Sequence, residues 1–115
     1  MRPPLLIATL LTALIGGVIA YGTLMPPGPP GPPLPLTDKQ MHALAFFSLV
    51  LPLGWVRPRW ALGLALVAFA FGGAIEIVQP QVGRSGEWAD LWADGLGIVA
   101  GLLPGQLRRY RASRA

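Results

Sequence analysis

Residues 5–25 read LLIATLLTALIGGVIAYGTLM, a run of 21 residues without a charge. An α-helix rises about 1.5 Å per residue, so this segment can cross a hydrocarbon core about 30 Å thick. A cleavable signal peptide is the alternative, with Arg2 as its basic start and a small-residue cleavage site ending at Ala20. Because the apolar run continues past Ala20, we favour a retained transmembrane helix.

The composition of the whole chain also indicates a membrane protein. Its 115 residues are 53% hydrophobic and 12% charged, whereas a soluble domain carries about 25% charged residues. The net charge of +4 does not indicate nucleic-acid binding, because much of it lies in an arginine tail of the kind that flanks a membrane span on the cytoplasmic side. The chain has no cysteine, which excludes disulfides and cysteine metal sites.

Three further apolar segments follow the first, at residues 38–56, 60–79 and 88–107. Residues 26–37 are rich in proline, which lacks a backbone N–H and predicts a stiff, extended connector. Residues 57–59 predict a tight basic turn, and residues 80–87 a short loop. The sequence therefore predicts one all-α domain over residues 1–115, built as a bundle of four transmembrane helices.

The distribution of basic residues sets the direction of these helices. Arg2, the basic turn and the arginine tail fall on one side of the predicted membrane, and only Lys39 and Arg84 fall on the other. Because cytoplasmic loops carry an excess of lysine and arginine, both termini are expected to be cytoplasmic. In this N-in/C-in topology the proline-rich connector and the loop at 80–87 face outward.

Polar residues gather where the apolar segments meet the predicted outer loops. The predicted ligand-binding residues are Asp38, Lys39, His42, Glu76, Gln79, Arg84, Asp90 and Asp94. A charge inside a membrane span costs roughly 2.5–3.5 kcal/mol at the helix centre, so such residues are functional candidates. His42 and Glu76 lie at similar depth in antiparallel helices, and we expect Arg84 to fold back over them. Asp38 and Asp94, at the adjoining helix starts, would complete a ring of polar side chains around His42 and Glu76.

The cluster is compatible with more than one chemistry. His42, Glu76 and Asp94 are candidate catalytic groups for acid–base chemistry, and whether the protein is an enzyme stays open. No spacing matches a metal motif such as H-E-x-x-H, so no metal and no cofactor is predicted. Lys39 and Arg84 are suited to hold a phosphate or carboxylate.

Small residues continue the acidic helix faces toward the centre of the membrane. Ala68 and Gly72 precede Glu76 at helical spacing, and Gly97-x-x-x-Gly101 follows Asp94. Small residues let membrane helices approach closely, so these faces should point into the bundle. The Gly97/Gly101 face is also a candidate contact between copies of the chain.

Taken together, these motifs resemble the VanZ-like membrane protein family. The matching stretches are Asp38-Lys39-x-x-His42-x-x-x-Phe46, Glu76-x-x-Gln79, Gly83-Arg84-Ser85 and Asp90-x-x-x-Asp94-x-x-Gly97. The family often has asparagine at the position of Asp94, so this chain carries an extra negative charge there. The resemblance implies a multi-pass protein of the bacterial plasma (inner) membrane. The founding member is associated with teicoplanin resistance, and no established biochemical activity comes with the family.

Two functional expectations follow from the cluster and the resemblance. In the first, the outer-facing polar site binds or acts on an anionic envelope component, such as a lipid-linked precursor or a cell-wall component. In the second, the protein is structural or binds a partner, and the polar cluster only locks the helices together. The expected surroundings in both cases are the lipid bilayer, without nucleic acid.

Overall fold

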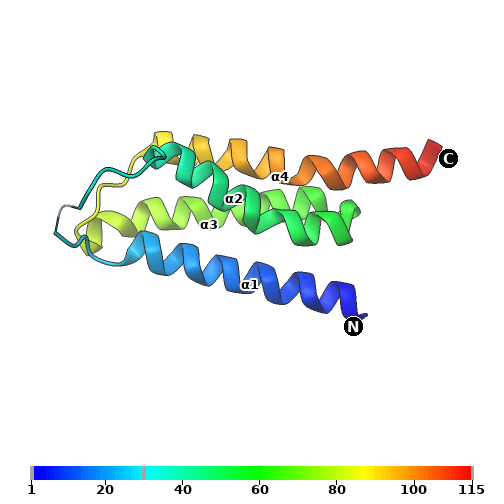
Figure 1. Ribbon diagram of the computed structural model, residues 1–115, viewed down its shortest axis with the longest axis horizontal. Helices are drawn as coiled ribbons and strands as arrows, with labels where there is room; N and C mark the ends of the chain where they lie inside the picture. Colours follow the sequence, from blue (N-terminus) through cyan, green and yellow to red (C-terminus); the bar gives the residue numbers. More distant parts are fainter. Residues whose placement is uncertain (1, 30, 115) are drawn as a thin grey trace.

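The computed structural model describes residues 2–29 and 31–114, which form four α-helices and no strand (Figure 1). The helices are α1 (Pro3–Leu24), α2 (Asp38–Val56), α3 (Ala61–Val78) and α4 (Trp88–Arg114). Two short 3-10 segments, η1 (Pro58–Trp60) and η2 (Gln79–Val82), flank α3. The predicted all-α architecture with four helices is confirmed. Met1, Pro30 and Ala115, which belong to the predicted domain, lie outside the described residues.

The start of α2 is fixed by a capping box. The Thr37 hydroxyl accepts a hydrogen bond from the Gln40 backbone N–H at 3.1 Å, and the Gln40 side chain accepts one from the Thr37 N–H at 3.0 Å. This reciprocal pair satisfies two of the backbone donors that a helix start leaves free. Thr37 is therefore the N-cap, and Asp38 is the first helical residue and is exposed.

The last helix is longer than the sequence predicted. α4 continues from Trp88 to Arg114 through Pro104, whereas residues 88–107 were expected. Its 27 residues correspond to about 40 Å of helix. Arginine is a good helix former, so the basic tail extends the helix instead of ending it.

The closest pair in the bundle is α2 with α4, which lie side by side (Figure 1). Three buried glycines of α4, at four-residue spacing, form the contact: Gly97, Gly101 and Gly105. A Cβ at Gly97 would overlap the carbonyl oxygen of Ala43, and one at Gly105 would overlap the carbonyl oxygen of Gly54. We call these three residues the glycine seam. Backbone therefore packs directly on backbone, as small residues allow in membrane helices.

The glycine seam also corrects an expectation about oligomers. Gly97 and Gly101 are covered by α2 of the same chain, so this face is not available to a second copy. On α3, Ala68, Gly72 and Glu76 are buried, as their spacing predicted. The apolar core of the bundle centres on Phe46, which is 1% exposed.

Two helical stretches in the described part of the chain are long and apolar enough to cross a membrane. They are Pro3–Leu24 and the continuous stretch Pro58–Val82. Only 11% and 22% of their apolar windows are buried in the bundle. Large apolar side chains such as Leu14 (64% exposed) and Leu62 (73%) therefore lie on the surface, which is unlike the core helix of a water-soluble protein.

The two ends of the bundle differ in chemistry. Figure 1 places both long connections, residues 25–37 and 79–87, at one end. The turn between α2 and α3 lies at the other end, together with the start of α1 and the end of α4. The acids belong to the first end, which we call the connector end, and most of the arginines belong to the second. The longest dimension of the molecule is 53 Å.

Candidate functional site

Asp94 lies at the centre of the polar cluster and is 1% exposed. Its Oδ1 lies 2.8 Å from Nδ1 of His42 on α2. Its Oδ2 has no hydrogen-bond partner among the described residues and faces α3 at Gly72, where a Cβ would lie only 2.7 Å from it. Glycine at position 72 therefore lets a carboxylate of α4 approach the backbone of α3.

Asp90, one turn before Asp94, forms the outer part of the same α4 face. Its Oδ2 lies 3.6 Å from Nε2 of His42, and its Oδ1 lies 3.4 Å from the Lys39 ammonium. Lys39 also pairs with Glu87 at 3.1 Å, and both of these side chains are about half exposed. His42 thus lies between two carboxylates: its Nδ1 is within hydrogen-bond distance of Asp94, and a protonated ring also forms an ion pair with Asp90.

Glu76 brings α3 into the cluster and is 4% exposed. Its Oε2 accepts a hydrogen bond from the backbone N–H of Glu87 at 2.8 Å, while its Oε1 has no partner among the described residues. A Cβ at Gly86 would lie 2.5 Å from the Glu76 carbonyl oxygen, so the loop crosses close to the end of α3. Glu76 therefore fixes the loop that leads into α4.

Gln79 is equally buried but has a different role. Its Nε2 donates to the Thr23 carbonyl oxygen at 3.2 Å, which ties the end of α3 to α1. Its Oε1 is a third buried acceptor without a partner in the described residues.

Three potential ligands converge at the centre of this cluster. His42, Glu76 and Asp94 each offer a ligand atom, and these atoms lie within 4.8 Å of one another. The unpartnered atoms of Glu76 and Asp94 are both carboxylate oxygens, which accept but cannot donate when ionised. A buried polar group without a partner costs about 1–3 kcal/mol, and more when it is charged. The arrangement is suited to a cation or to a ligand that presents hydrogen-bond donors.

The structure brings some of the predicted site residues together and separates others. The expected proximity of His42 and Glu76 is confirmed, but the hydrogen-bonding partner of His42 is Asp94. The expectation for Arg84 is wrong: its guanidinium donates to the Met25 carbonyl oxygen at 3.4 Å and forms no ion pair with an acid in the described residues. Asp38 does not join the polar cluster either. It is exposed and forms no ion pair among the described residues.

Two features of the site were not predicted from the sequence. Glu87 is exposed, but its backbone N–H donates to Glu76 and its carboxylate pairs with Lys39, which the sequence did not predict. A metal was not expected, yet the chain assembles an imidazole and two carboxylates as described above. Because these groups come from three helices, no local spacing could reveal them.

The charges of the site indicate which kind of ligand would fit it. Its buried part combines one imidazole with an excess of carboxylates, and its cation Lys39 lies at the exposed rim. Comparison of the chain with protein-family models, with curated proteins and with solved structures finds no match.

Proposed function

We propose that this chain is a multi-pass, VanZ-like integral membrane protein in which His42, Glu76 and Asp94 hold a divalent cation near the outer end of the bundle. The observation that carries this proposal is the pair of carboxylate oxygens, on Glu76 and Asp94, that are buried beside His42 without a partner in the described residues. A bound cation would neutralise both acids and occupy both oxygens.

The proposed membrane location is supported by the outer surface of the bundle. Most residues of the apolar windows of α1 and α3 are not buried in the bundle, and lipid is the solvent that suits them. α2 and α4 are less apolar along their length, but α2 contacts each of the other three helices. The acids Asp90 and Asp94 of α4 are buried in the bundle, which is where ionisable groups are tolerated inside a membrane.

The proposed N-in/C-in orientation is supported by the positions of the arginine and tryptophan side chains. Arginines gather at the end that holds the α2–α3 turn, and positive charge favours the cytoplasmic side. Trp88 and Trp92 are exposed near the connector end, and Trp55 and Trp60 are exposed at the other end. Tryptophans prefer the two membrane interfaces, so each pair is suited to mark one of them.

The donor set favours a transition metal. Imidazole suits zinc and similar ions, and carboxylates suit manganese and other hard cations, so Zn²⁺ and Mn²⁺ are the appropriate test ions. Three protein ligands leave a coordination position for an exogenous group. An anionic envelope component would fit there, through its phosphate or carboxylate. Lys39 and Arg84 are less suited to meet it directly, because each already has a partner.

Metal analysis of the purified protein tests the cation site. We expect about one Zn²⁺ or Mn²⁺ per chain after reloading of the chelator-treated protein in detergent. Asp94→Asn and Glu76→Gln should weaken binding by more than about 10-fold, the lower limit for losing even an outer-shell partner. Asp38→Asn is the matched control, because it removes a carboxylate charge from an exposed residue that forms no ion pair among the described residues. If the folded wild-type protein binds neither ion at micromolar concentrations, the proposal fails.

The same variants test the structural alternative. If the cluster only locks the helices together, Asp94→Asn and Glu76→Gln should lower the yield of folded protein, and the wild-type protein should be equally stable with and without metal. The cation proposal instead predicts that metal raises the stability of the wild-type protein but not that of the variants, because a ligand that binds only the folded state stabilises it.

Cysteine labelling tests the topology separately. The natural chain has no cysteine, so Gly31→Cys and Ser113→Cys each introduce a unique site. We expect an impermeant reagent to label the first from outside intact cells and the second only after the membrane is opened. Labelling of both from the same side would contradict the four-span arrangement.

A further inference from the structure

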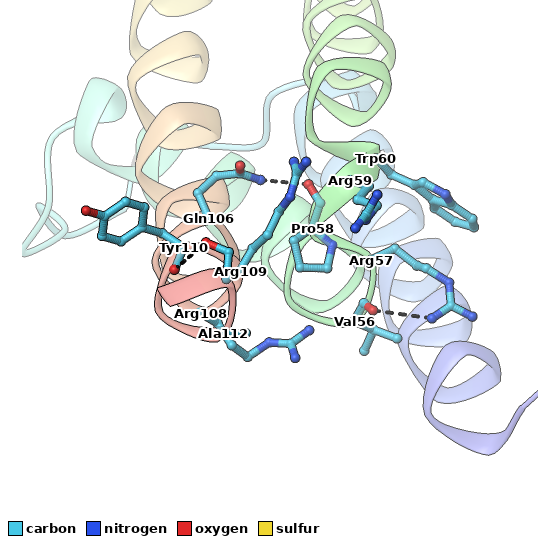
Figure 2. A pocket seen from close by; sticks show the side chains of 11 residues that line it. Val56, Arg57, Pro58, Arg59, Trp60, Gln106, Arg108, Arg109, Tyr110 and Ala112 are labelled. Atoms are coloured by element: carbon cyan, nitrogen blue, oxygen red, sulfur yellow. Dashed lines mark hydrogen bonds between the residues drawn. The ribbon is translucent and has the colours of Figure 1, made fainter. Parts of the chain in front are cut away.

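The end of the bundle opposite the cation site is strongly basic. A hollow of about 810 Å³ at this end is lined by Arg57 and Arg59 of the α2–α3 turn and by Arg108 and Arg109 of α4. Figure 2 shows these side chains. In the part of the chain that the structure describes, none of these arginines pairs with an acid. Their positive charge is therefore uncompensated by the protein.

Two of these guanidinium groups are held in place by neighbouring aromatic rings and backbone oxygens. Arg108 donates to the Trp55 carbonyl oxygen, and its guanidinium carbon lies 4.9 Å from the centre of the Trp55 ring. Arg57 donates to the Val56 carbonyl oxygen at 3.4 Å and lies 5.9 Å from the centre of the Trp60 ring. A guanidinium keeps further donors free after such contacts, because it has five N–H groups.

An apolar groove leads away from this basic end. Arg57 and Arg108, with Arg2 of the α1 start, line a second hollow of about 300 Å³. It shares Trp55 and Val56 with a groove of about 690 Å³ between α1, α2 and α4. The groove is lined by Ile7, Ala8, Leu11, Leu51, Pro52 and Pro104. We call the two together the lipid groove, with the three arginines as its mouth.

We propose that the lipid groove binds an anionic phospholipid, with the phosphate at Arg2, Arg57 and Arg108 and an acyl chain along the apolar part. Arginine pairs with phosphate through parallel N–H···O bonds, and basic pockets between membrane helices on the cytoplasmic side bind anionic headgroups. Because the three arginines adjoin the apolar groove, a lipid fits better than free phosphate, which would leave the apolar residues uncovered. This inference uses the proposed membrane location but is independent of the cation site.

Native mass spectrometry of the detergent-solubilised protein tests the proposal. The probes are phosphatidylglycerol and phosphatidylcholine with identical acyl chains. We expect the wild-type chain to retain phosphatidylglycerol more tightly. Arg57→Gln and Arg108→Gln should each weaken that binding about fivefold, the effect of about 1 kcal/mol per basic residue near a membrane surface. Arg111→Gln is the matched control, because it removes an exposed arginine of α4 outside the lipid groove.

Three results would overturn the proposal. The first is equal retention of the two lipids by the wild-type protein. The second is equal weakening of phosphatidylglycerol binding by Arg111→Gln and Arg57→Gln. The third is binding of glycerol phosphate as tight as that of phosphatidylglycerol, which would leave the apolar groove without a role. Should Arg108→Gln fail to fold because Arg108 contacts Trp55, Arg2→Gln serves instead, since Arg2 is exposed at the start of α1.

Discussion

The glycine seam gives the sharpest prediction about stability. At Gly101, an added Cβ would lie 2.5 Å from the Phe47 carbonyl oxygen and 2.7 Å from a methyl carbon of Val50. An ordinary contact begins near 3.4 Å, so α2 and α4 must separate by roughly 1 Å, because a backbone oxygen cannot rotate away. A gap of 0.5–1 Å already loses about a quarter to a half of each dispersion contact, and overpacking typically costs about 1–3 kcal/mol.

Gly101→Ala should therefore lower the free energy of unfolding by about 1–3 kcal/mol relative to Gly17→Ala. Gly17 lies in α1 with nothing within 4 Å of an added Cβ, so its substitution changes only the helix propensity. That propensity gain is about 1 kcal/mol in both variants and cancels in the comparison. The assay is unfolding in mixed micelles with increasing denaturing detergent, followed by circular dichroism. Equal stability of the two variants would refute the close approach of α2 and α4.

Three further predictions concern single positions and use the same assay. Thr37→Ala removes the side-chain cap of α2 and should cost about 1 kcal/mol; an unchanged midpoint would show that the cap contributes nothing. Gly83 has a φ of 79°, so Gly83→Ala should cost about 1–2 kcal/mol, whereas Gly31→Ala, with open space around it, should be close to neutral. Phe46→Ala empties the most buried apolar position and should cost about 3–5 kcal/mol, far more than Phe69→Ala, since Phe69 is 39% exposed. Equal losses for the two phenylalanines would contradict the assigned core.

Much of the helical framework could be predicted because it depends on local signals. The run of apolar residues defined α1, and the ends of α2 follow from a capping box and a basic Arg-Pro turn. The end of α4 was missed because the predicted helix stopped with the apolar segment at residue 107 and the arginines after it were interpreted as a tail. Arginine is a good helix former, however, so the helix continues through the tail to Arg114.

The site was harder to predict because it depends on which helices touch. Sequence order suggested that His42 of α2 would meet Glu76 of the next helix, α3. His42 does lie close to Glu76, but the glycine seam brings α2 closest to α4, so Asp94 is the residue that bonds to His42. The position of the Arg84 side chain could not be predicted either, because a long side chain in a loop follows no periodic pattern.

The pairing of α2 with α4 has a consequence for the order in which the chain can assemble during synthesis. His42 and Asp94 are 52 residues apart, and α3 must leave the ribosome before α4 does. Until then, the α2 backbone lacks the glycine seam that packs against it, and His42 has neither of its two aspartate partners. α1, α2 and α3 are thus synthesised as an unfinished set, and the last helix completes both the packing and the polar cluster in one step. A chain that stops before Asp94 lacks the central acid of that cluster, so translation must pass this codon before the protein can reach its final form.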